Sequence, residues 1–197
     1  MNHLESLKKP KISVGIIALN EEDYLPDMFS CVKAQDYPHP LVQVVLIDSG
    51  SKDSTPGIMK EFAARATDFE SVTLLPNPGK TLPKGFNLFL NSATGEIIVR
   101  LDAHARIPND FLSQMVTVLE EGEDVVGGPR PTVTPKNATA WQRVLHTVEE
   151  SMFGASIAKY RGKSKSDSNA PQYVKSVFHP GYRRSVIDKV GSFNEEL

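Results

Sequence analysis

Three short runs of apolar and β-branched residues constrain the fold of this chain more than any other feature. They are ISVGIIAL (residues 12–19), VQVVLIDSG (residues 42–50) and EIIVRLDA (residues 96–103). Each run is nearly continuous rather than alternating, which is typical of a strand that is covered on both faces. Segments with helical spacing separate the runs, so the order of elements predicts a parallel sheet with right-handed crossovers.

The remaining segments extend the same pattern. We expect further strands at residues 71–77 and 124–129, and helices at residues 21–35, 51–65, 82–93 and 109–122. Asn20 is expected to cap the first helix. The second half predicts a helix within residues 137–160, a polar loop at 161–171, and a strand, a turn and a short helix within 174–193. The chain is therefore predicted to be an α/β protein whose mostly parallel sheet is flanked by helices.

Composition narrows the class of protein. The chain has 197 residues, of which 40% are hydrophobic and 23% are charged, as in a single globular domain. Its net charge of −2 provides no basic field, so we expect no nucleic-acid partner. Cys31 is the one cysteine, so no internal disulfide can form, and a reducing compartment is favoured. The apolar runs are too short to span a bilayer.

Polar side chains follow three of the predicted strands. Asn20 and Glu21 come after the first, Asp48 and Ser51 after the second, and Asp102 begins the polar end of the third. In open parallel sheets, ligands bind outside the carboxyl ends of the strands. The coincidence therefore predicts a binding site at this edge, although a single acid such as Asp48 is equally typical of a turn or a helix cap.

Asp102 and His104 stand two residues apart at the carboxyl end of the strand predicted at residues 96–103, with Asp102 inside the strand and His104 directly after it. In extended backbone such residues point to the same face, so a carboxylate and an imidazole would share one divalent cation. Two protein ligands make a weak site, which a diphosphate would complete around Mn²⁺ or Mg²⁺. The imidazole favours Mn²⁺. The alternative is a surface turn in which His104 only hydrogen-bonds to the backbone.

Several well-known motifs are missing. The sequence NPGKT at residues 77–81 is similar to the end of a P-loop, but Leu74 stands where that loop requires its first glycine. No G-x-G-x-x-G follows the first strand, which argues against a dinucleotide-binding domain. The chain also lacks a G-x-S-x-G nucleophile elbow and an H-E-x-x-H zinc helix.

The ordered set of motifs resembles the family 2 glycosyltransferases of the GT-A fold. The resemblance rests on SVGIIALNEEDYL, then VVLIDSGSKDST, then PKGFNLFLNSATGEIIVRLDAHARIP. VVGGP, SMFGASIAKYR and the final VFHPGYRRSVIDKVGSFNEEL are similar to bacterial exopolysaccharide glycosyltransferases of the succinoglycan type. The resemblance implies a Rossmann-like, nucleotide-sugar (donor) binding subdomain at residues 1–130 and a partial, incomplete acceptor-side subdomain at 131–197.

The resemblance also assigns donor-binding residues. Ala18, Asn20 and Glu21 match the strand end that holds the uracil and ribose of the nucleotide. Asp48 matches the acid that reads the nucleobase, and Ser51 stands beside it.

Three further matches concern the phosphate end of the donor. Lys84 matches a basic position near the nucleotide, and Asp102 matches the first acid of the family's Asp-x-Asp motif, which touches ribose or metal. His104 stands where the family has the second acid, which binds the metal and the diphosphate.

The reaction implied by the resemblance is a metal-assisted, inverting transfer of a sugar. We expect a UDP-sugar as donor and a polysaccharide or lipid-linked glycan as acceptor. The family's general base lies shortly after a G-x-F-[ND]-E stretch, which GSFNEEL at residues 191–197 matches. Glu195 and Glu196 fall too early to be that base, so it is expected beyond Leu197. The chain would then be truncated and itself inactive, whereas the full-length protein would act in the cytoplasm at the inner face of the membrane.

Two other classes of function stay open at this point. A nucleotidyltransferase is the first, although it usually has a glycine-rich basic loop after the first strand, and ALNEED lacks one. The second is a non-catalytic domain that binds a nucleotide sugar without turning it over.

Overall fold

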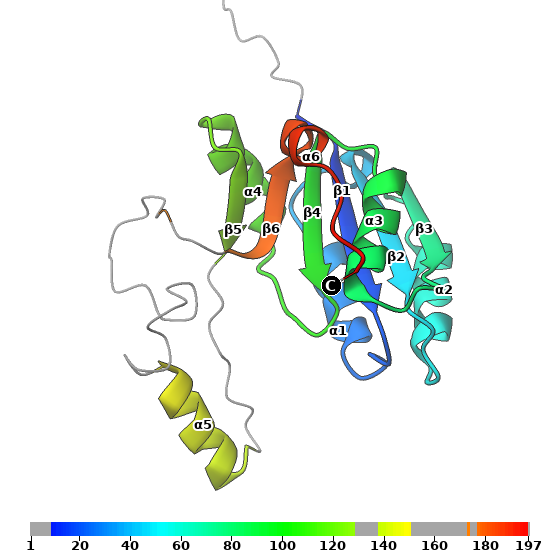
Figure 1. Cartoon of the computed structure of the whole chain (residues 1–197), viewed down its shortest axis with the longest axis vertical. Coiled ribbons are helices and arrows are strands. Elements are labelled where there is room, and N and C mark those ends of the chain that lie inside the picture. Colours follow the sequence, from blue (N-terminus) through cyan, green and yellow to red (C-terminus); the bar gives the residue numbers. More distant parts are fainter. Residues whose placement is uncertain (1–8, 129–137, 151–172, 174–176, 197) are drawn as a thin grey trace, which may run out of the picture. The chain divides into compact units, whose positions relative to one another are not determined.

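The computed structural model describes residues 9–128, 138–150, 173 and 177–196. Its strands form one sheet in the order β3-β2-β1-β4-β6-β5 (Figure 1). β3, β2, β1 and β4 pair with one another in parallel, and β6 runs antiparallel to β4. Their bounds are β1 Ile12–Ala18, β2 Val42–Asp48, β3 Ser71–Pro76, β4 Ile97–Asp102, β5 Val125–Gly128 and β6 Phe178–Arg183.

Helices alternate with the first five strands, as predicted. They are α1 Leu25–Lys33, α2 Thr55–Arg65, α3 Leu82–Ser92, α4 Phe111–Glu120, α5 Ala140–Glu150 and α6 Arg184–Val190, with a short 3₁₀ helix η1 at His39–Leu41. In Figure 1, α3 lies in front of β1 and β2, and α1 lies behind the sheet. The predicted α/β fold with a mostly parallel sheet flanked by helices is confirmed.

Two local predictions are wrong. Asn20 does not cap the first helix, because α1 begins at Leu25 after Tyr24, and Asn20 has a left-handed φ of 56° in the preceding loop. No turn separates the last strand from the last helix, since β6 continues directly into α6 at Arg184. The loop predicted at 161–171, and the second half of the helix predicted within 137–160, lie outside the described residues.

The chain divides into two compact units. One contains the residues up to Val125 together with those from Gly181 onward, and the other runs from Val126 to Pro180. All the predicted binding residues belong to the first unit. Donor and acceptor roles for residues 1–130 and 131–197 remain predictions. Within the described segments, none of the helices combines the length and the apolar character needed to cross a lipid bilayer.

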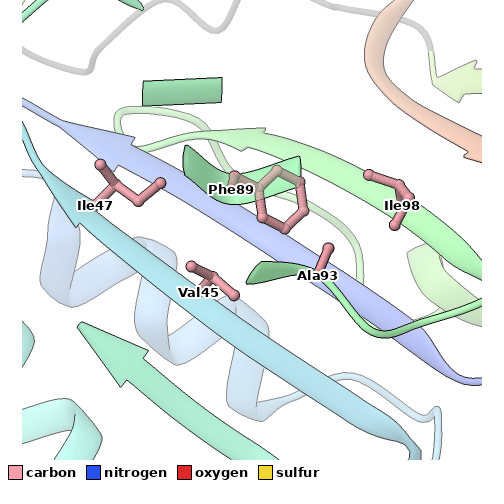
Figure 2. Close-up of a cluster of buried hydrophobic side chains, with 5 residues drawn as sticks. All are labelled: Val45, Ile47, Phe89, Ala93 and Ile98. Carbon is pink, nitrogen blue, oxygen red and sulfur yellow. The ribbon is translucent and has the colours of Figure 1, made fainter. Parts of the chain in front are cut away.

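The core under α3 depends on one ring. Phe89 of α3, which is 1% exposed, packs with Val45 and Ile47 of β2, Ile98 of β4 and Ala93 directly after α3 (Figure 2). It also lies directly over β1 at Gly15, where an added Cβ would stand 2.4 Å from the ring. The absence of a side chain at Gly15 therefore lets α3 approach the sheet closely.

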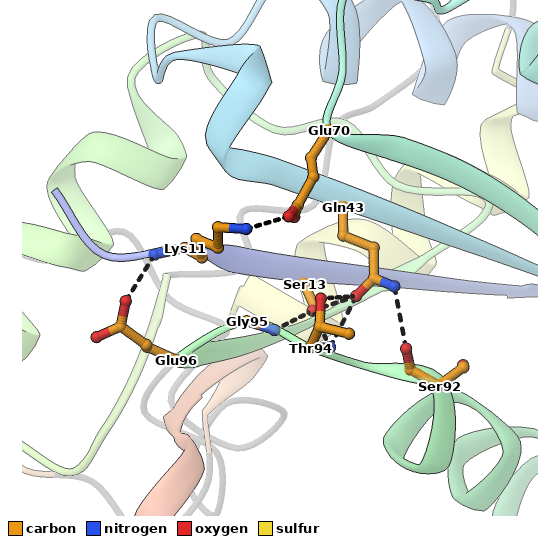
Figure 3. A network of polar contacts seen from close by, with 8 residues as sticks. All are labelled: Lys11, Ser13, Gln43, Glu70, Ser92, Thr94, Gly95 and Glu96. Atoms are coloured by element: carbon orange, nitrogen blue, oxygen red, sulfur yellow. Dashed lines mark hydrogen bonds and ion pairs between the residues drawn. The ribbon is translucent and has the colours of Figure 1, made fainter.

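A buried polar network fixes the opposite, amino-terminal ends of the same strands (Figure 3). The Ser13 hydroxyl donates to Gln43 Oε1 at 2.6 Å, and Gln43 Nε2 donates to the Ser92 carbonyl at 3.0 Å. Backbone N–H groups of Thr94 and Gly95 donate to Gln43 Oε1 and Ser13 Oγ at 2.9 and 2.8 Å. Because these buried groups are satisfied only in this alignment, the network fixes the register of β1, β2 and the turn into β4.

Substitution of Gly15 tests the close approach of α3. We expect Gly15→Ala to lower the free energy of unfolding by roughly 1–3 kcal/mol, because its methyl group would overlap the Phe89 ring. Gly57→Ala in α2 is the matched control, since nothing lies within 4 Å of its Cβ position, and this change should be neutral or stabilise by up to about 1 kcal/mol. Urea denaturation measures both. Equal effects of the two variants would contradict the packing described here.

Candidate functional site

The polar strand ends predicted from the sequence lie at one edge of the sheet. In the parallel registers, Ala18 at the end of β1 is paired with Asp48 of β2, and Ile17 is paired with Asp102 of β4. The two carboxylates therefore flank the end of the central strand on either side. Ala18 itself is buried, and its carbonyl accepts the N–H of Ser49 at 2.9 Å.

The loop after β1 is tied to the loop after β2. The Asn20 N–H donates to Ser51 Oγ at 2.9 Å, and Asn20 Oδ1 accepts the Lys52 N–H at 2.8 Å. The Ser51 N–H in turn donates to Asp48 Oδ1 at 3.1 Å. Asparagine tolerates the left-handed conformation that this exchange requires at Asn20. Three of the predicted residues thus form one continuous hydrogen-bonded set.

A second set of contacts joins the same two loops. The Glu21 N–H donates to the hydroxyl of the buried Thr55 at 2.8 Å, and the Ser54 N–H donates to Glu22 Oε2 at 2.8 Å. Asp53 Oδ2 accepts the Glu22 N–H at 3.2 Å. Loss of hydration opposes ionisation of Asp53, but hydrogen bonds from Thr55 and Glu22 outweigh it and lower the pKa of this carboxyl. Its stabilising contribution is therefore present near neutral pH and is lost as pH falls through the lowered pKa.

Glu21 also connects the first strand end to that of β4. Its Oε1 lies 3.1 Å from His104 Nδ1, and 19% of the Glu21 side chain is exposed against 53% for His104. The Tyr24 and His104 rings form a T-shaped pair, with centroids 6.3 Å apart. The extended backbone predicted from Asp102 to His104 is wrong, because β4 ends at Asp102 and residues 103–104 form a turn in which the Ala105 N–H donates to the Asp102 carbonyl at 3.1 Å. The surface turn of the alternative is therefore present, although the imidazole faces the Glu21 carboxylate rather than the backbone alone.

Asp102 and His104 are the donor set available for a divalent cation. Among the described residues, no three His, Cys, Asp or Glu side chains are arranged to hold a metal. The half-buried carboxylate of Asp102 and the exposed imidazole of His104 are ligands that suit Mn²⁺, but two ligands leave most of its coordination shell to other groups. The pair therefore fits an ion that arrives with a diphosphate better than one held by the protein alone.

The lysines lie on the β3 side of this edge. The Lys84 side chain passes over Gly79, where an added Cβ would stand 2.2 Å from Lys84 Cδ. Lys80 extends over Gly50, with its Cε 3.2 Å from the position of a Cβ there. Lys80 therefore lies beside the turn that contains Asp48 and Ser51.

Sequence reasoning missed three residues of this region. Thr55 was not predicted because Ser, Asp and Thr are common residues at the start of a helix. Lys80 was not predicted because it lies in NPGKT, which was rejected as an incomplete P-loop. The third, Arg100, carried a visible signal, because it is the one charged residue inside the apolar run of β4.

Comparison with known proteins places the chain in a family. The family model described as Glycosyl transferase family 2 matches residues 13–191. The chain is 28% identical over 179 residues to an undecaprenyl-phosphate 4-deoxy-4-formamido-L-arabinose transferase of Proteus mirabilis, covering 90% of this chain and 50% of the relative. A Pseudomonas savastanoi protein of the same description is 26% identical, with 90% and 48% covered. The chain thus spans about half the length of these curated relatives.

Solved structures share the fold at lower identity. A mannosyltransferase of Pyrobaculum calidifontis in complex with GDP-Man and Mn²⁺ superposes with a TM-score of 0.69 at 23% identity, over 97% of this chain and 49% of that one. S. aureus TarS 1-349 in complex with UDP gives a TM-score of 0.63 at 21% identity, over 95% and 51%. At this identity the likeness shows the fold alone.

Removal of the Thr55 hydroxyl tests how the loops are held. We expect Thr55→Val to lower the free energy of unfolding by roughly 1–3 kcal/mol, because the Glu21 N–H loses its acceptor without a change of shape. The pKa of Asp53, followed by NMR, should rise toward its ordinary value. Thr117→Val is the control, because that exposed hydroxyl bonds only to a carbonyl of its own helix. Indistinguishable stabilities and an unmoved Asp53 titration would contradict this account.

Proposed function

The chain belongs to glycosyl transferase family 2, and we propose that it forms the donor-binding part of an inverting glycosyltransferase. It binds a nucleotide sugar, with a UDP-sugar as our choice, at the edge formed by the carboxyl ends of β1, β2 and β4. One observation carries the proposal: hydrogen bonds and the contact between Glu21 and His104 link the polar ends of these three strands into one set. Ligands bind at this edge of open parallel sheets.

The β1–β2 side of the edge offers the groups that a nucleoside needs. The Asp48 carboxylate accepts the Ser51 N–H, and the Ser51 hydroxyl accepts the Asn20 N–H. Both groups would read the nucleobase. Asn20 and the backbone at Ala18 would face the base and ribose, and Glu21 lies between them and His104. TarS is described in complex with UDP and with UDP-GlcNAc, which supports this choice of nucleotide.

The β4 side offers a place for the diphosphate and its cation. Asp102 and His104 would hold Mn²⁺ or Mg²⁺, which supplies a positive charge to the leaving diphosphate where negative charge develops. Because Nδ1 of His104 faces Glu21, the ring would present Nε2 to the metal, and a carboxylate behind a ligating histidine fixes its orientation. Lys84 and Lys80 add positive charge on the β3 side. The mannosyltransferase bound to GDP-Man and Mn²⁺ supports this use of a metal.

The acceptor and the general base complete the reaction. The base removes the proton of the acceptor hydroxyl as that oxygen attacks the anomeric carbon, and we place this base beyond Leu197. Glu195 Oε1 accepts a hydrogen bond from Asn87 Nδ2 at 2.7 Å, which holds this carboxylate against α3. The curated relatives are named for undecaprenyl-phosphate, which supports a lipid-linked acceptor and an association of the full-length protein with the inner face of the membrane.

The alternative functions have less support. Family membership favours glycosyl transfer over nucleotidyl transfer. The succinoglycan-type role in exopolysaccharide biosynthesis rests on sequence motifs only, and the relatives described above are transferases of another kind. A domain that binds the donor without turning it over is separated from a transferase by assaying the full-length protein with a lipid-linked acceptor.

Nucleotide binding tests the proposal on this chain. We expect UDP with Mn²⁺ to raise the melting temperature, because ligand binding to the folded state stabilises it by about 2.7 kcal/mol at a hundred times the Kd. Asp102→Ala should reduce the rise to that seen with UDP in the absence of Mn²⁺. Asp68→Asn is the control. This exposed acid precedes β3 and so lies at the amino ends of the strands, away from the proposed site, and its replacement should leave the rise intact. No rise with UDP, GDP or their sugar derivatives in the presence of metal would contradict the proposal.

A further inference from the structure

Arg100 is a charged residue in the middle of a buried strand. Only 30% of its side chain is exposed, and its neighbours Val99 and Leu101 are fully or nearly fully buried. Alternation along β4 places Arg100 on the same face as Ile98 and Asp102, which is the face covered by α3. Burial of a cation costs free energy unless other groups compensate the charge, so the contacts of Arg100 need an explanation.

The surroundings hold the guanidinium in place independently of Asp102. Its central carbon lies 4.3 Å from the centroid of Phe86 in α3, as in a cation–π contact. Phe193 packs against the same ring at 5.2 Å. On β6, Tyr182 lies near enough that the charge of Arg100 opposes the rise in the Tyr182 pKa that burial causes. The ring and the strand therefore set where the guanidinium lies.

The contact with Asp102 is a single one. Arg100 Nη2 donates to Asp102 Oδ1 at 3.3 Å, and the buried Nε has no hydrogen-bond partner among the described residues. The pair is thus neither the bidentate fork nor the 2.7–2.9 Å contact of a strong arginine–carboxylate bridge. Asp102 has at least one interaction besides this one. A carboxylate has about four acceptor positions, so a contact through one oxygen is compatible with a cation on the same group.

We propose that Arg100 is a positioning residue for the donor site, which orients the Asp102 carboxylate through Nη2 toward the metal. The inference rests on the proposed function, because Asp102 is the ligand whose orientation matters. The contact with Phe86 holds the guanidinium in place, and the guanidinium in turn orients the Asp102 carboxylate. Loss of such a neighbour of a metal ligand typically costs 10–100-fold in metal affinity.

The test is a cycle of variants assayed by calorimetric titration of UDP with and without Mn²⁺. We expect Arg100→Met to weaken the Mn²⁺-dependent binding of UDP about ten-fold and to leave metal-free binding unchanged. In an Asp102→Asn background, Arg100→Met should cause no further loss, because the carboxylate through which it acts is gone. Arg100→Lys should fall between Arg100→Met and the unsubstituted chain. Arg65→Met, an exposed arginine paired with Glu61, is the matched control and should change nothing.

Two results would overturn the inference. Unchanged Mn²⁺-dependent binding in Arg100→Met would show that Asp102 needs no such neighbour. Weaker metal-free binding, with a further loss in the Asp102→Asn background, would show that Arg100 contacts the diphosphate itself. Arg100→Lys, which keeps the charge, provides the same comparison if Arg100→Met does not fold.

A measurement on the ligand-free chain separates this inference from the proposed function. NMR relaxation of the Asp102 side chain should show less order in Arg100→Met than in Arg65→Met. If the unsubstituted chain binds no nucleotide, the proposed function fails, and the order of Asp102 still decides whether Arg100 positions it. Equal order in the two variants would refute the positioning role.

Discussion

The parallel alignment of β2, β1 and β4 is the constraint on which the site depends. Because all three strands run in the same direction, the pairings Ala18 with Asp48 and Ile17 with Asp102 bring two acids to the same end of the sheet. The Phe89 ring packs directly on Gly15, so α3 lies close to these strands, and the Ser13–Gln43 network holds their amino-terminal ends. The core and the network therefore set the register, and the register sets the spacing of the acids.

The loops that leave these strands are held by each other and not by helix caps. None of the helices α1, α2 and α3 has a side-chain hydrogen bond at its N-cap. The polar groups bond across the edge instead, from Asn20 to Ser51, from Glu21 to Thr55 and from Glu21 to His104. Such an arrangement keeps the groups of a binding site in place before the ligand arrives, which reduces the entropy lost on binding.

The sequence predicts the strands well because a buried strand needs a continuous apolar run, as at residues 42–48 and 97–101. It predicts the shared edge for the same reason, since parallel strands must end together. It fails at Asn20, where the usual capping preference gives way to contacts from a distant loop. The roles of Lys80 and Thr55 were equally out of reach, because each depends on a neighbour from another strand end. Arg100 was visible as an anomaly, but its partner Phe86 comes from a helix that no local pattern connects to it.

Paramagnetic broadening by Mn²⁺ in the presence of UDP tests the central claim most directly, because it locates the ion along the sheet. If the carboxyl ends of β1, β2 and β4 form the site, the amide signals of Asn20, Ser51, Ala103 and His104 disappear first. Those of Ser13, Gln43 and Thr94, at the other end of the same strands, keep more of their intensity. Broadening centred on that other end, or uniform across the sheet, would contradict the account.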